Sequence, residues 1–100
     1  MQTDEQVEVR AQTLAKVQEI RTLVSRALVL EFREGQASAE GSDDWDDINN
    51  AKWHAYEAAA EVLPSGTAVL ERGEDGFLAM LQEFESATNY QIAQKVGLPW

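Results

Sequence analysis

The feature that most constrains the fold is a long stretch, residues 4–34, in which apolar side chains recur every three or four positions. It contains neither glycine nor proline. The apolar positions are Val7, Ala11, Leu14, Val17, Ile20, Val24, Leu28 and Phe32, and Leu23, Ala27 and Leu30 widen the stripe. This spacing places them on one face of an α-helix. Thr3 and Gln6 form a capping box, so the pattern predicts one helix over residues 4–34.

Such a helix is too long for a compact chain of 100 residues. At 1.5 Å per residue it would measure roughly 46 Å. A compact chain of this size has a diameter of roughly 35 Å. The helix is therefore expected to project beyond its own domain, to bend, or to lie against a partner.

The rest of the chain is expected to complete one domain over residues 1–100 with two or three shorter helices. These are predicted at about 43–62, 77–86 and 89–96. The small, glycine-containing residues 35–42 predict a flexible linker. Residues 67–72 are compatible with a strand, a helical turn or a loop. The predicted fold class is therefore all-α, with a long N-terminal helix followed by shorter ones.

Three short signals refine these boundaries. Ser42 is the expected N-cap of the second helix, and Pro64 and Gly66 end it. Thr88 and Gln91 form a second capping box at the start of the last helix. The expected core positions of the second helix are Ile48, Ala51, Ala55, Ala59 and Val62.

The charge of the chain is strongly negative and unevenly distributed. Eighteen acidic residues against eight basic ones give a net charge of −10. Residues 1–34 carry six acids and five bases, whereas residues 35–100 carry twelve acids and only three bases. An acidic surface repels nucleic acid and anionic membranes and attracts basic surfaces. Ordinary solubility is the simpler explanation of the same charge.

Residues that support catalysis are scarce. The chain has no cysteine, and its one histidine, His54, lies within an alanine-rich helical segment. Without a second histidine or a cysteine, neither a zinc site nor an activated nucleophile can be assembled from the usual residues. No phosphate-binding glycine loop is present, because Glu74 and Asp75 occupy the one glycine-flanked turn. We therefore expect neither an enzyme nor a bound cofactor or metal.

The most unusual local feature is the run from Ser42 to Asp47, which contains four aspartates around Trp45. Acids in the first turn of a helix are stabilised by the helix dipole. A calcium loop fits poorly, because Ile48 stands where glycine is needed and His54 where glutamate is needed. The third interpretation is a recognition patch that imitates phosphates. The expected partner-binding residues are Asp43, Asp44, Trp45, Asp46, Asp47, Glu71, Glu74 and Asp75.

The C-terminal residues 88–99 resemble the first helix and turn of a helix-turn-helix motif. In that motif the next helix enters the major groove of DNA. Only Trp100 follows, and a single base, Lys95, lies in the segment. A glycine-terminated helix with an apolar contact from Leu98 explains the same residues. Trp100 itself is expected either to fold back over the helix at 77–86 or to contact a partner.

The long capped helix from Thr3 to Gly35 and the acidic run Ser42–Asp47 together resemble phage-encoded anti-CRISPR proteins. The likeness is nearest to helical inhibitors of the type I-F surveillance complex, and it extends over the whole chain. It implies binding, without a reaction, to basic residues that would otherwise engage target DNA. Lysines and arginines in such a channel already accept polyanions.

We therefore expect an inhibitor whose partner is a protein or ribonucleoprotein with a basic nucleic-acid-binding surface. Direct nucleic-acid binding and membrane association are not expected. The acidic, polar start of the chain and the lack of cysteine favour the cytoplasm of a bacterial host. The alternatives are a helical assembly or dimerisation module and a truncated helix-turn-helix regulator.

Overall fold

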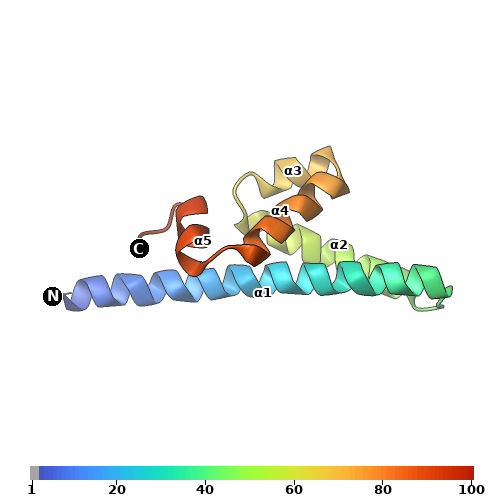
Figure 1. Ribbon diagram of the computed structural model, residues 1–100, viewed down its shortest axis with the longest axis horizontal. Helices are drawn as coiled ribbons and strands as arrows, with labels where there is room; N and C mark the ends of the chain where they lie inside the picture. The colour runs from blue at the N-terminus through green and yellow to red at the C-terminus, as the bar shows by residue number, and fades with distance from the viewer. Residues whose placement is uncertain (1–2) are drawn as a thin grey trace.

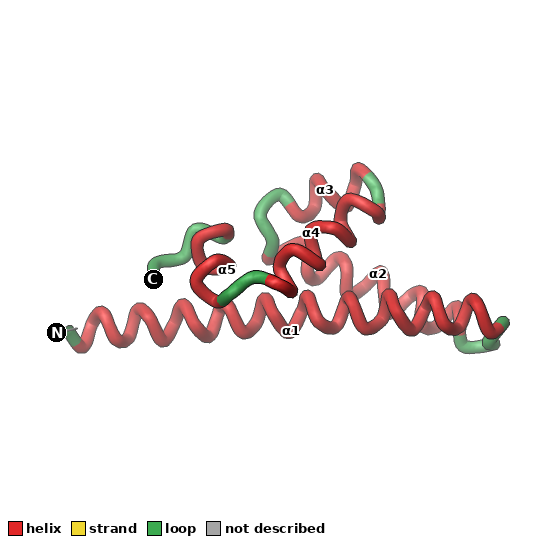
Figure 2. Tube along the Cα trace, viewed as in Figure 1, coloured by secondary structure: helices red, strands yellow, loops and turns green. Residues whose placement is uncertain are grey.

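The computed structural model describes residues 3–100, and these fold into helices joined by short loops (Figures 1 and 2). The helices are α1 (Asp4–Glu40), α2 (Trp45–Val62), α3 (Gly66–Arg72), α4 (Glu74–Ser86) and α5 (Asn89–Lys95). No strand occurs within this described part of the chain. The expected all-α fold, with a long first helix in a small single domain, is confirmed.

α1 runs the full length of the molecule and is unbent in Figure 1. The molecule measures 58 × 23 × 19 Å, and its radius of gyration of 15.9 Å exceeds the roughly 13 Å expected for a compact chain of this size. α2 runs back along the C-terminal half of α1, α4 crosses the pair, and α5 lies on the N-terminal half (Figure 1). Of the expected possibilities, the helix projects: its first two turns are exposed.

The start of α1 is as predicted, but its end is not. Thr3 Oγ1 accepts a hydrogen bond from the Gln6 backbone, and Gln6 Oε1 accepts one from the Thr3 backbone. The predicted linker at 35–42 is wrong over residues 35–40, which continue the helix. Ala37 in this last segment is buried, which favours the helix over a loop. The helix ends at Gly41, whose left-handed backbone (φ 67°) lets its N–H and that of Ser42 close onto the last turn.

The core lies where α1, α2, α4 and α5 meet. Its most completely buried members are Val17, Val24 and Ala27 of α1, Tyr56 and Ala59 of α2, Phe77 and Leu81 of α4, and Ile92 and Ala93 of α5. On α2 the buried side chains include the small residues Ala55, Ala59 and Ala60. Four positions of the predicted apolar faces are instead exposed, namely Val7, Ala11, Phe32 and Ala51. Each belongs to an apolar pattern, but no helix covers it.

The ambiguous residues 67–72 are helical, and α4 begins earlier than predicted, at Glu74 rather than Phe77. Gly66 at the start of α3 is buried, and a Cβ built on it would lie 2.4 Å from the Ala60 carbonyl oxygen. Only glycine allows this close approach, which turns the chain from α2 into α3. The second helix begins at Trp45 rather than residue 43, and Asp44, not Ser42, stands at its N-cap position without a side-chain cap bond.

α5 ends at Lys95, one residue before the predicted boundary, and it is tied to α1. Its capping box forms as predicted, with Thr88 Oγ1 accepting from the Gln91 backbone at 3.2 Å. Arg21 of α1 donates to the carbonyl of Ala87 and to the Asn89 side chain, at 2.6 and 2.7 Å. The loop before α5 is therefore fixed against the long helix.

The C-terminal tail also returns to α1. Thr13 donates to the Pro99 carbonyl at 2.6 Å. The Trp100 ring lies against Tyr90 and the Arg10 guanidinium, each 5.9 Å away. Trp100 thus folds back over α5 and α1 rather than over the helix at 74–86, and it remains 44% exposed.

Candidate functional site

The four aspartates of the acidic run surround the turn between α1 and α2, at one end of the molecule. Asp43 and Asp44 lie in the turn, and Asp46 and Asp47 lie in the first turn of α2. All four side chains are exposed. The Ser42 hydroxyl accepts a hydrogen bond from the Asp44 backbone, so it organises the turn rather than capping the helix.

Trp45, one of the expected partner-binding residues, sits at the centre of this run but is less exposed than the aspartates around it. Its side chain is half-buried, and its indole Nε1 donates to Glu34 Oε1 of α1 at 2.9 Å. This bond fixes the ring against the long helix. One edge of Trp45 remains available beside the aspartates, while the polar atom is already satisfied.

The other predicted partner-binding residues lie at the junction of α3 and α4. Glu71 and Asp75 are exposed. Glu74 is half-buried, and its carboxylate accepts from Lys52 of α2 at 2.7 Å. In Figure 1 this junction stands above α2, apart from the turn between α1 and α2. The predicted residues therefore form two acidic groups rather than one continuous patch.

Lys52 connects these two groups, although sequence reasoning did not single it out. It is only 3% exposed, and its ammonium lies between Glu74 and Glu34, the latter at 3.7 Å. It also lies over the rings of Trp53 and Tyr56, at 5.1 and 5.6 Å. Because Glu34 in turn holds Trp45, a chain of polar contacts runs from the acidic turn to α4.

A signal for Lys52 was present in its spacing. It precedes Ala55 and Tyr56 by three and four residues, so it shares their buried face of α2. A lone lysine on such a face needs carboxylate partners to be stable there. The sequence alone does not show that these partners are Glu34 and Glu74, from two other helices.

Tyr56 is the second unusual group at this junction. It is fully buried, and within residues 3–100 its hydroxyl has no hydrogen-bond partner. Its ring makes edge contacts with Trp53 and Phe77, at centroid distances of 5.5 and 5.2 Å. Burial raises the pKa of the Tyr56 phenol well above its ordinary value, and the negative charges of Glu31, Glu74 and Glu34 raise it further.

These contacts change the charge that the second half of the chain presents. Of its three basic residues, Lys52 is buried between carboxylates, and Lys95 is paired with Glu83. Arg72 is exposed. The exposed aspartates of the turn form none of the ion pairs found in residues 3–100, whereas Arg72 lies beside the acids of the α3–α4 junction.

The described residues contain no candidate metal site. No group of three or more histidine, cysteine, aspartate or glutamate side chains between residues 3 and 100 is placed to hold a metal ion. His54 is exposed on α2, away from the Lys52 network. None of the helices in this range is long and apolar enough to cross a membrane.

The fold and its surface define a class: an elongated, acidic, all-helical protein built on one long helix. Comparison with protein-family models, with curated protein sequences and with solved structures finds no match to this chain.

Proposed function

We propose that this chain is a non-enzymatic binding protein that inhibits a nucleic-acid-binding complex by occupying its basic surface. The observation that carries the proposal is the charge of the second half of the molecule. Twelve acids are found there against three bases, of which Lys52 is buried between Glu34 and Glu74, and Lys95 is paired with Glu83 at the surface. Such a surface is complementary to lysines and arginines that hold phosphates.

The exposed aspartates of the α1–α2 turn are the part of this surface best placed for contact. They project from one end of an elongated molecule, where a narrow tip can enter a nucleic-acid channel. Their charge would accelerate association, and apolar contacts such as the free edge of Trp45 would slow release. The acids at Glu71 and Asp75 form a second, separate contact surface.

The partner named by the likeness to anti-CRISPR proteins is the type I-F surveillance complex of a bacterial host. In this proposal the chain is a phage protein that acts in the host cytoplasm. It competes with target DNA for the basic residues of the complex and catalyses no reaction.

The test is a competition assay between this protein and target DNA for the purified surveillance complex. We expect the wild-type chain to displace target DNA. A variant with Asp43→Asn, Asp44→Asn, Asp46→Asn and Asp47→Asn should bind at least roughly tenfold more weakly, since it loses several charge contacts. Circular dichroism should show unchanged helicity.

The matched control carries the same change in net charge at another place. It replaces the exposed residues Glu5, Glu19, Glu57 and Glu61 by glutamine, and it should compete nearly as well as the wild type. Equal weakening of both variants would show that only overall charge matters and would remove the turn from the site. Failure of the wild type to bind the complex would exclude this partner, and a gel shift with DNA alone would support a regulator instead.

A further inference from the structure

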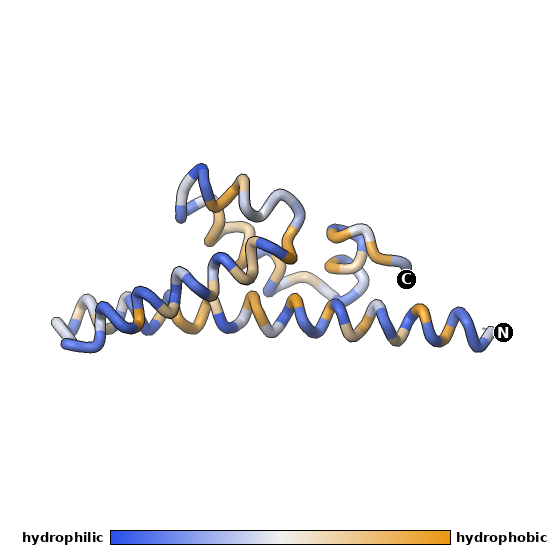
Figure 3. Tube along the Cα trace, turned by 180° about the vertical axis from the view of Figure 1, so that it is seen from behind, coloured by the Kyte–Doolittle hydropathy of each residue, from blue (hydrophilic) through white to orange (hydrophobic). Residues whose placement is uncertain are grey.

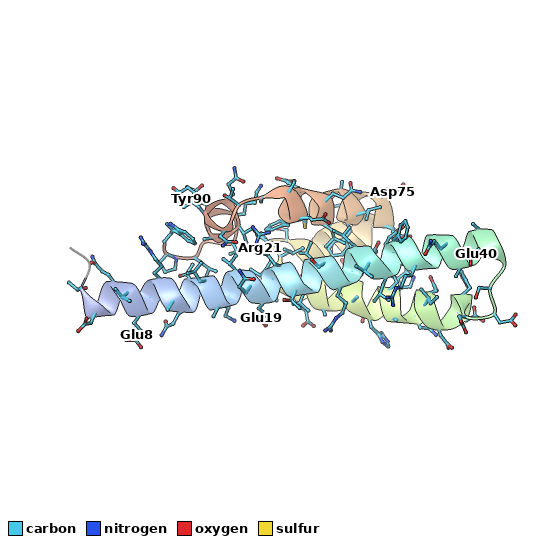
Figure 4. All side chains as sticks on the ribbon, turned by 60° about the horizontal axis from the view of Figure 1, so that its bottom comes forward. Glu8, Glu19, Arg21, Glu40, Asp75 and Tyr90 are labelled. Carbon is cyan, nitrogen blue, oxygen red and sulfur yellow. The ribbon has the colours of Figure 1, made fainter. Side chains whose placement is uncertain are left out.

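α1 has one face that no other part of the molecule covers. Its core residues, such as Val17 and Val24, are buried against the other helices, whereas most residues on the opposite side are exposed; Leu14 on that side is half-buried. Figure 4 shows Glu8 and Glu19 on the side of α1 opposite α4 and α5. In Figure 3, hydrophobic residues recur along α1 up to its N-terminal end, beyond the other helices.

The open face carries an apolar stripe with a polar middle. Val7, Ala11 and Leu14 form its N-terminal end, and Val29 and Phe32 form its C-terminal end. Residues eighteen apart occupy the same angular position after five helical turns, so Ala11 lies in line with Val29, and Leu14 with Phe32. Val7, Val29 and Phe32 are 51%, 49% and 66% exposed. Exposed apolar residues gathered along one line mark an interaction surface.

The charges beside this stripe differ between its two ends. Asp4 and Glu8 flank the N-terminal end, and Arg26 and Arg33 flank the C-terminal end on the same edge of the helix. All four are exposed, and none makes an ion pair with another residue between 3 and 100. The face is therefore acidic at one end and basic at the other.

We propose that this face binds the same face of a second copy of the chain, with the two α1 helices antiparallel. A two-fold axis near residues 18–21 places Val7 of each copy beside Phe32 of the other. It also brings Asp4 and Glu8 of each copy beside Arg33 of the other, so the unpaired charges find opposite partners. Because the contact is isologous, each complementary pair forms twice.

A parallel arrangement is disfavoured by the same charges. It would put the two acidic ends at one level and the two basic ends at another, on opposite edges of the pair, so none of these complementary pairs could form. The overlap from Val7 to Phe32 spans roughly 39 Å of helix. A single helix pair of this length is a small interface, so the dimer should form at micromolar concentrations.

This inference does not rest on the proposed function. The pairing uses only the outer side of α1, so it leaves the acidic turn and the α3–α4 junction exposed in both copies. The resulting dimer would present these acidic surfaces at both of its ends.

The first test measures oligomeric state by sedimentation equilibrium between about 5 and 200 µM, the range suited to a small interface. The wild type should pass from monomer to dimer. Val29→Glu should raise the dissociation constant at least roughly tenfold, because it buries an unpaired charge. Val9→Glu makes the same change on the opposite side of α1 and should leave dimerisation unchanged. A wild type that stays monomeric throughout would overturn the proposal.

The second test mixes two charge-reversal variants. Asp4→Lys with Glu8→Lys makes both ends of the face basic, and Arg26→Glu with Arg33→Glu makes both ends acidic. Each variant alone should dimerise at least roughly tenfold more weakly, because like charges then meet. Mixed together they should form a heterodimer at least as readily as the wild type. No recovery on mixing would contradict the proposed pairing.

The third test fixes the orientation by oxidation of introduced cysteines, since the chain has none of its own. Gln18 and Gln36 are both exposed and lie eighteen residues apart on the same line of α1. Gln18→Cys lies near the two-fold axis and should form a disulfide-linked dimer, whereas Gln36→Cys should not. Equal cross-linking at both positions would indicate parallel helices and overturn the antiparallel model.

Discussion

At the scale of single residues, Lys52 is the group on which the packing of three helices depends. Its ammonium is shared between Glu34 of α1 and Glu74 of α4, and it also lies over the rings of Trp53 and Tyr56 of α2. A buried charge is stable only while its partners are present. The same lysine therefore holds α4 against the α1–α2 pair.

Replacing Lys52 by alanine should lower the free energy of unfolding by about 3 kcal/mol, because it leaves partly buried carboxylates without a counter-charge. Lys52→Met keeps most of the stem and should cost about 1 kcal/mol less. Urea denaturation measures both. Lys95→Ala is the control: its pair with Glu83 is largely exposed, so the loss should stay below about 1 kcal/mol. Equal losses at both lysines would refute a special role for Lys52.

Tyr56 is the other residue whose chemistry is decided by burial. Its hydroxyl is enclosed without a hydrogen-bond partner in residues 3–100, which costs free energy that its ring contacts offset. Tyr56→Phe should therefore leave stability at neutral pH unchanged or raise it by up to about 1 kcal/mol. If Tyr56→Phe instead lowered the free energy of unfolding by more than about 1 kcal/mol, the hydroxyl would have a bridging water or another hydrogen-bond partner.

The raised pKa of Tyr56 gives this variant a pH signature. The phenol in the unfolded chain ionises near its ordinary value of 10.0, whereas the folded phenol stays neutral. Its contribution to stability is therefore fully present below pH 10 and is lost as the pH rises above that value. The gain of Tyr56→Phe over the wild type should grow between about pH 9 and 11.5. Thermal melts of both proteins across this range test it, and Tyr90, present in both, cancels.

At the scale of helices, the two glycines near the end of α1 have opposite roles. Gly35 lies inside the helix, and a Cβ there would meet nothing within 4 Å. Gly41 ends the helix with φ 67°, a conformation that other residues rarely adopt. The residue type cannot distinguish the two positions, because both are glycine. They differ in backbone conformation, since Gly35 is helical and Gly41 is left-handed.

Gly35→Ala should stabilise the protein by about 0.5–1 kcal/mol, because alanine favours a helix interior over glycine. Gly41→Ala should destabilise it by about 1 kcal/mol, since it strains the left-handed cap. Chemical denaturation of the two single variants makes the comparison directly. If both changes were neutral, residues 35–42 would be the flexible linker that the sequence predicted.

At the scale of the whole molecule, shape and charge act together. The net charge of −10 is spread along a body 58 Å long, and much of it lies at the α1–α2 turn and the α3–α4 junction. Mutual repulsion of like charges destabilises a folded chain. Salt weakens that repulsion by shortening its range to about 3 Å at 1 M.

Raising sodium chloride from about 0.02 to 0.5 M should therefore increase the melting temperature by a few degrees. The variant with four aspartates of the turn replaced by asparagine has a net charge of −6, four less negative than the wild type's −10. Its melting temperature should rise less with salt. Circular dichroism measures the melting temperatures of both proteins. If the melting temperature of the wild type fell with added salt, attractive ion pairs would outweigh the repulsion.

The sequence by itself predicted the long helix and the helices at about 43–62, 77–86 and 89–96, but not the helical continuation at 35–40 or the helix at 66–72. The apolar period of α1 and the two capping boxes, at Thr3 and Thr88, are local signals whose physics needs no other part of the chain. For the same reason the sequence identified the acidic run and its exposed aspartates. It also indicated that the helix projects, bends or lies against a partner, because a helix of this length exceeds the diameter of so small a domain.

Only the tertiary structure decided where the first helix ends, which apolar residues are buried and which charges pair. Gly35 does not end the helix, because burial of Ala37 beyond it favours the helical backbone. Phe32 is exposed because no helix lies over that part of α1. Lys52 acquires its partners from residues 18 positions before it and 22 after it. Such pairings depend on how whole helices cross, which local preferences do not specify. The long helix is thus a property of the sequence, whereas its one uncovered face is a property of the fold.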